Sequence, residues 1–148
     1  YLPRSKMENT IPSVAEKPIA FSGGTETILV VEDESAIREM IVRYLTRLAY
    51  TVLSAENGPV ALEIWKTRKD TIDLLLTDMV MPGGMSGVQL ASRIQLEKTI
   101  PIVYMSGYSE FIGVRGLDLK DGVNFIPKPF SLPAVAQAVR ARLDEIKS

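Results

Sequence analysis

The chain has 148 residues, 46% of them apolar, and a formal net charge of −1, so its composition is that of one soluble domain and not of a basic nucleic-acid binder. It has no cysteine and no histidine, which excludes disulfides, thiolate metal sites and imidazole bases. Any bound metal must therefore be held by oxygen, which favours Mg²⁺, Ca²⁺ or Mn²⁺.

The first 26 residues read as a tail or linker, because they contain three prolines and a Gly-Gly pair and show no sustained periodicity. We expect the folded domain to occupy residues 27–148. No apolar run approaches the roughly 18–20 residues of a membrane span, and the first residues of the sequence lack the apolar stretch of a signal peptide. We therefore expect a cytoplasmic location and no membrane contact by this segment.

Short apolar runs alternate with helical patterns along the rest of the chain. The runs predict strands at 28–31, 50–55, 74–77, 102–105 and 123–127. Ser35 is a candidate cap for the first helix, Asn57 opens the second, and Ser131 caps the last. Gly113 and Gly116 each cost about 1 kcal/mol in a helix interior, so the helix expected within 109–119 should be short or irregular. The other helical stripes are Ile37, Met40, Ile41, Tyr44, Leu45 and Leu48; Ala61, Leu62 and Trp65; Gly87, Leu90, Ala91 and Ile94; and Val135, Val139, Leu143 and Ile146.

This alternation predicts an α/β fold with a parallel sheet, because continuous apolar strands need helices on both faces. Right-handed crossovers leave a three-layer, doubly wound, five-stranded sheet of order 2-1-3-4-5 as the leading topology.

Chemically active side chains follow four of the five predicted strands. Glu32 and Asp33 follow the first, Asp78 the third, Ser106 the fourth and Lys128 the fifth. In the proposed order these strand ends meet at one edge, where ligands bind in such sheets. Three carboxylates repel one another, and a lysine and a hard divalent cation would compensate.

Each of these residues also has an ordinary reading. The acids at 32 and 33 could start a helix, Asp78 and Ser106 could be turn residues, and Lys128 could be a solvated surface side chain. Chance agreement at all four converging strand ends is improbable, which favours a functional site.

Over about Thr27–Lys147 the sequence resembles the receiver domain of bacterial two-component response regulators. The matching segments are 29–34 (LVVEDE), 76–82 (LTDMVMP), 105–107 (MSG) and 126–130 (IPKPF). The resemblance implies that Asp78 is the phosphoacceptor. It also implies that Glu32, Asp33, Asp78 and the backbone carbonyl of Val80 hold Mg²⁺.

By the same resemblance, Ser106 matches the hydroxyl that hydrogen-bonds the phosphoryl group and Lys128 the lysine that contacts it. The Lys128–Pro129 bond is expected to be cis. Phe125 matches the aromatic switch residue, although an ordinary core aromatic is an equally good reading from sequence. The implied partner is a histidine kinase or a histidine phosphotransfer domain, and we expect a monomer or a weak dimer.

Two segments of the sequence are similar to segments of hybrid sensor histidine kinases. The loop 81–87 (MPGGMSG) is one residue longer than is common in regulators, and Tyr1–Arg4 resembles the end of a kinase ATP-binding domain. We therefore expect the C-terminal receiver of a hybrid kinase, whose parent chain could be membrane-anchored. The chain ends after the last predicted helix, so we expect no DNA-binding output domain. A stand-alone regulator is the alternative.

Functions of other classes are less well matched. An aspartate-nucleophile phosphatase needs a second aspartate two residues after the nucleophile, where this chain has Val80. A flavin- or nucleotide-binding module needs a Gly/Ser/Thr-rich phosphate loop after the first strand, where Glu32 and Asp33 would repel a phosphate. A pseudo-receiver that only binds partners would not need the complete acid, hydroxyl and lysine set.

Overall fold

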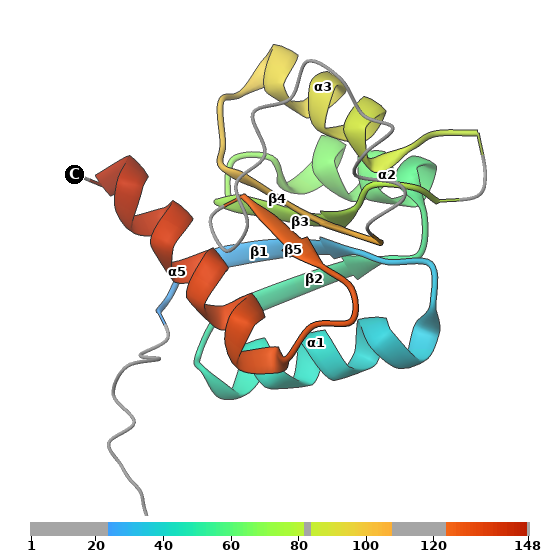
Figure 1. Ribbon diagram of the computed structural model, residues 1–148. Coiled ribbons are helices and arrows are strands. Elements are labelled where there is room, and N and C mark those ends of the chain that lie inside the picture. The colour runs from blue at the N-terminus through green and yellow to red at the C-terminus, as the bar shows by residue number, and fades with distance from the viewer. Residues whose placement is uncertain (1–23, 82–83, 108–123, 148) are drawn as a thin grey trace, which may run out of the picture.

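The computed structural model describes residues 24–81, 84–107 and 124–147, and its centre is one parallel sheet of strand order β2-β1-β3-β4-β5 (Figure 1). This confirms the predicted topology. The strands are β1 (Thr27–Val31), β2 (Thr51–Ala55), β3 (Leu74–Asp78), β4 (Ile102–Ser106) and β5 (Phe125–Pro127). The helices are α1 (Ser35–Arg47), α2 (Gly58–Arg68), α3 (Gly87–Glu97) and α5 (Leu132–Lys147).

The helices cover the sheet from both sides, α1 and α5 on one face and α2 and α3 on the other (Figure 1). Successive residues of a strand point to opposite faces. Leu75 of β3 accordingly packs in the cluster that contains Trp65 of α2, while Leu76 packs in the cluster that contains Val139 of α5. β3 is buried along its whole length, which explains why its sequence is an almost unbroken apolar run.

The helix starts agree with the sequence at two of three predicted caps. The Asn57 side chain accepts a hydrogen bond from the Val60 amide (2.9 Å), and the Ser131 hydroxyl accepts one from the Ala134 amide (3.2 Å). The prediction that Ser35 caps α1 is wrong, because Ser35 is the first helical residue and Glu34 holds the cap position. The Glu34 amide donates to the Glu32 carboxylate (3.1 Å), so an acidic side chain of the preceding loop sets this helix start.

The strand ends also differ slightly from the prediction. Asp78 and Ser106 are the last residues of β3 and β4, and not the first residues after them. The helix predicted within 109–119 lies outside the described residues, and the boundary predicted after residue 26 stays a prediction. In the part of the chain that the structure describes, no helix has both the length and the hydropathy to cross a bilayer.

Candidate functional site

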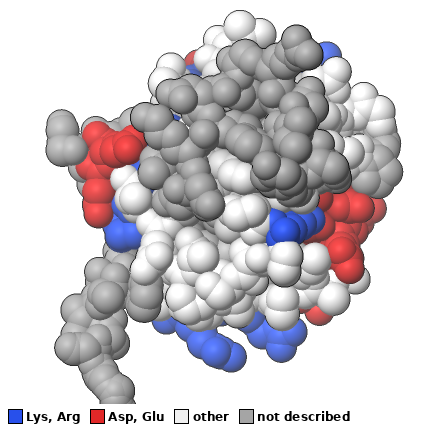
Figure 2. Space-filling model, viewed as in Figure 1, with Lys and Arg blue, Asp and Glu red and all other residues white. Residues whose placement is uncertain are grey.

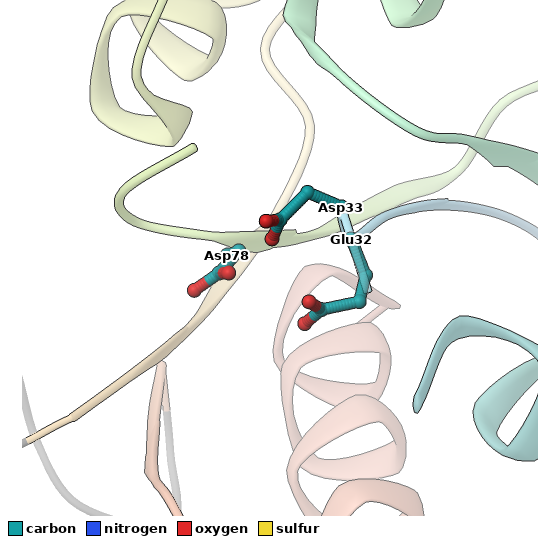
Figure 3. Close-up of side chains that lie close together, drawn as sticks. All are labelled: Glu32, Asp33 and Asp78. Carbon is teal, nitrogen blue, oxygen red and sulfur yellow. The ribbon is translucent and has the colours of Figure 1, made fainter. Parts of the chain in front are cut away.

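Three carboxylates converge at the carboxyl-terminal edge of the sheet. Glu32 and Asp33 leave the end of β1, and Asp78 ends the neighbouring strand β3, with Val31 and Thr77 as the last pair in register. One oxygen from each carboxylate lies within 4.8 Å of the others (Figure 3). Glu32 and Asp78 are buried, whereas Asp33 is exposed. The sheet topology therefore produces the predicted cluster and leaves it open on the Asp33 side.

Lys128 reaches the same cluster from the end of β5. Its Nζ donates to Glu32 Oε1 and to Asp78 Oδ2, both at 3.2 Å. Its backbone amide donates to the Ser106 carbonyl (2.8 Å), which ties the lysine to the end of β4. The Lys128–Pro129 peptide is cis, as the resemblance to receiver domains implied. The lysine is thus held between the two buried acids.

The cluster contains more acidic than basic side chains, and the pKa values of its groups reflect this excess. Burial, followed by the charge of Glu32, raises the pKa of Asp78 to about 7, although Lys128 opposes the shift. Burial also raises the pKa of Glu32, against the Glu34 amide and Lys128. Burial by itself would lower the pKa of Lys128, but the Asp78 and Glu32 carboxylates outweigh it, so this pKa is raised.

The donor atoms of this cluster fit a hard divalent cation. All three side chains offer carboxylate oxygens, which Mg²⁺ prefers, and Mg²⁺ keeps several water or phosphate ligands in its octahedron. The exposed Asp33 leaves room for those ligands. Val80 lies two residues beyond Asp78 with a half-exposed side chain, and its carbonyl as a further ligand stays a prediction.

Ser106 and Phe125 flank the cluster. Ser106 is buried, its hydroxyl donates to the Gly107 carbonyl (3.1 Å), and it follows Met105, which is in register with Asp78. Phe125 is also buried and begins β5 within the core cluster on the α2 and α3 face. Its position as a core aromatic is therefore observed, while its role as a switch stays a prediction.

Sequence reasoning missed side chains that hold the backbone of the site. The Arg38 guanidinium, in the first turns of α1, donates to the Glu32 carbonyl (2.8 Å). Thr77 and Gly87 contact the peptide of Asp78. A hydroxyl inside an apolar strand was the one sequence signal that could have pointed to Thr77.

Figure 2 shows acidic side chains gathered at the side of the molecule toward which the carboxyl ends of the strands point, with basic side chains next to them. An incoming cation would be attracted to this side.

Comparisons with known proteins agree with this architecture. A family model described as the response regulator receiver domain matches residues 28–140. The sensor kinase CckA of Brucella abortus is 39% identical over 125 residues, which are 82% of this chain and 13% of that protein. The transcriptional regulatory protein ResD of Bacillus subtilis is 36% identical over 117 residues, 78% of this chain and 47% of that protein. The chain thus spans less than half the length of these relatives.

Solved structures give the same result. The receiver domain of the hybrid histidine kinase CckA superposes with a TM-score of 0.66 and 36% identity, covering 79% of this chain and 98% of that one. The response regulator PhyR of Brucella abortus, at 21% identity and a TM-score of 0.73, shares the fold over 86% of this chain and 51% of its own. The chain therefore belongs to the response regulator receiver domain family of two-component signalling.

Proposed function

We propose that Asp78 accepts a phosphoryl group from a phosphohistidine of a histidine kinase or histidine phosphotransfer partner, with Mg²⁺ held by Glu32, Asp33, Asp78 and the Val80 carbonyl. The observation that carries this proposal is the position of Asp78. Its carboxylate is buried, lies 3.2 Å from Lys128 Nζ, and has the carboxylates of Glu32 and Asp33 beside it.

In the proposed reaction, an Asp78 carboxylate oxygen attacks the phosphorus in line with the leaving imidazole nitrogen. The P–O bond forms as the P–N bond breaks, the imidazole keeps the electron pair of that bond, and the product is an aspartyl phosphate. The ionised form of Asp78 is the nucleophile, and a lower pKa would enlarge its ionised fraction near neutral pH. Bound Mg²⁺ would supply the positive charge that lowers this pKa and offsets charge on the phosphoryl oxygens.

The other side chains act on the transferred group. Lys128 would exchange its contact with Asp78 for one with a phosphoryl oxygen, while Glu32 keeps the ammonium in place. The Ser106 hydroxyl would turn from the Gly107 carbonyl to the phosphoryl group, and Phe125 would move into the space that it leaves. This movement would reshape the surface near β5 and α5, and a partner that prefers one of the two forms reads it as a signal. Attack of water on the aspartyl phosphate resets the domain.

We further propose that the chain is the receiver of a hybrid sensor histidine kinase. The support is the 39% identity to a sensor kinase and the 36% identity to a hybrid-kinase receiver, together with the loop 81–87. On this proposal the parent chain is the kinase, and the domain itself only accepts the phosphoryl group and loses it to water.

Intact-mass spectrometry tests the acceptor directly. The chain incubated with Mg²⁺ and acetyl phosphate should gain the mass of one phosphoryl group, and EDTA should prevent the gain. Asp78→Asn should abolish it, because an amide is a far weaker nucleophile than a carboxylate. Asp70→Asn, which changes an exposed acid, should react like the unchanged chain. A gain of equal size in Asp78→Asn would place the acceptor elsewhere.

A further inference from the structure

The peptide carbonyl of Asp78 lies where strand pairing with β1 stops. The register between β1 and β3 ends at Val31 and Thr77, one residue before Asp78. On the other side of β3, the Leu75 amide donates to the carbonyl of Pro101, just before β4, and the amide of Met79, just after β3, donates to the Met105 carbonyl in β4. The odd-numbered positions therefore face β4 and Asp78 faces β1. β1 has already turned into the loop of Glu32 and Asp33 at this level. The Thr77 hydroxyl donates to the Asp78 carbonyl (2.9 Å).

Gly87, the first residue of α3, closes over the same peptide. A Cβ at this position would lie 1.7 Å from the Asp78 carbonyl oxygen and 3.0 Å from Thr77 Oγ1, so only glycine fits. The Gly87 amide donates to the Met79 carbonyl (2.8 Å). A capping box of Ser86 and Gln89 fixes the start of α3 at this point.

Strand formation alone does not explain the hydroxyl of Thr77. Thr77 is fully buried and follows three leucines in β3, where valine has a similar shape and a similar preference for strands. Burying a hydroxyl carries a desolvation cost that its hydrogen bond must offset. The bond falls on the Asp78–Met79 peptide, the first of the two peptides between the proposed acceptor and Val80, whose carbonyl is the proposed ligand.

We propose that Thr77 is a positioning residue of the acceptor site: its hydroxyl, together with Gly87, holds the Asp78 peptide so that the Asp78 carboxylate stays beside Glu32, Asp33 and Lys128. This inference rests on the proposed function. Loss of the hydroxyl frees the carbonyl and lets the end of β3 shift, and shifts of about 1 Å at a reacting group can cost up to about a hundredfold in rate.

The test compares Thr77→Val, which removes the hydroxyl and keeps the shape, with Thr77→Ser, which keeps the hydroxyl. Calorimetric titration with Mg²⁺ gives the Kd, and intact mass gives the rate of phosphoryl uptake at saturating Mg²⁺. Thr77→Val should bind Mg²⁺ and react about fivefold to tenfold less well than the unchanged chain, with native circular dichroism, and Thr77→Ser should recover both. If Thr77→Val does not fold, Thr77→Ala takes its place, because alanine also lacks the hydroxyl and has no γ-methyl group that could press against Gly87.

Thr46→Val is the matched control, because the Thr46 hydroxyl also donates to a backbone carbonyl, that of Val42, but on an exposed part of α1. It should leave both measurements unchanged. The inference about Thr77 would be overturned if the folded variants that lack the hydroxyl kept the Mg²⁺ affinity and the rate of the unchanged chain. It would also be overturned if Thr77→Ser were as impaired as Thr77→Val. Neither result would affect the proposed function. If the unchanged chain neither binds Mg²⁺ nor gains a phosphoryl group, the proposed function itself fails.

Discussion

Lys128→Ala is expected to slow phosphoryl uptake at Asp78 by about 10²–10³-fold, the usual cost of removing one charged group that stabilises a transition state. Lys128 Nζ lies 3.2 Å from an Asp78 oxygen, and the lysine side chain is only 25% exposed, so water cannot fully replace the ammonium group. The rate is measured by intact mass at saturating Mg²⁺ and a fixed concentration of acetyl phosphate.

Lys66→Ala provides the control, because Lys66 forms an exposed ion pair with Glu63 and should not affect the rate. A rate within threefold (about 0.6 kcal/mol in barrier) of the unchanged chain in Lys128→Ala would remove the lysine from the proposed chemistry.

The second large effect is an expected gain in stability in Asp78→Asn, whereas most substitutions of buried residues lower the stability of the folded state. The pKa of Asp78 is raised from 3.8 to about 7, so the folded state binds its proton more tightly than the unfolded state does. The stability from this group is fully present below pH 3.8 and is lost as the pH rises through about 7. Asp78→Asn carries no charge at any pH, so it avoids that loss.

In EDTA at pH 8, Asp78→Asn should therefore be more stable than the unchanged chain by about 2–4 kcal/mol, and the difference should shrink at pH 4. Urea unfolding at the two pH values measures it. Mg²⁺ at pH 8 should stabilise the unchanged chain more than the variant, because only the unchanged chain keeps all three acids. An Asn variant that is less stable than the unchanged chain at pH 8 in EDTA would show that Lys128 already neutralises the site.

The sequence was sufficient for the fold and for the residues that meet at the site. Buried parallel strands are continuous apolar runs, and the doubly wound topology then dictates which strand ends are neighbours, so Asp78 and Lys128 could be placed together although 50 residues separate them. The start of α1 was missed by one residue, because Glu34 holds the cap position without a capping side chain of its own and its amide donates to the Glu32 carboxylate.

The supporting contacts could not be derived in the same way. Gly87 looked like one more small residue of a helical stripe, and only the distance from its missing Cβ to the Asp78 carbonyl reveals why it is glycine. Thr77 likewise has ordinary strand propensity. The pKa of Asp78 depends on how deeply the carboxylate is buried and on how near Glu32 comes, which are properties of the folded chain alone.

Calorimetric titration of Asp33→Asn with Mg²⁺ shows whether Glu32, Asp33 and Asp78 share one divalent cation. Asp33 is exposed and its substitution should leave the fold intact. We expect one Mg²⁺ per unchanged chain and a Mg²⁺ affinity lowered by about tenfold or more in Asp33→Asn, with Asp70→Asn unaffected. An Asp33→Asn chain that binds Mg²⁺ as tightly as the unchanged chain would show that the three carboxylates do not share the ion.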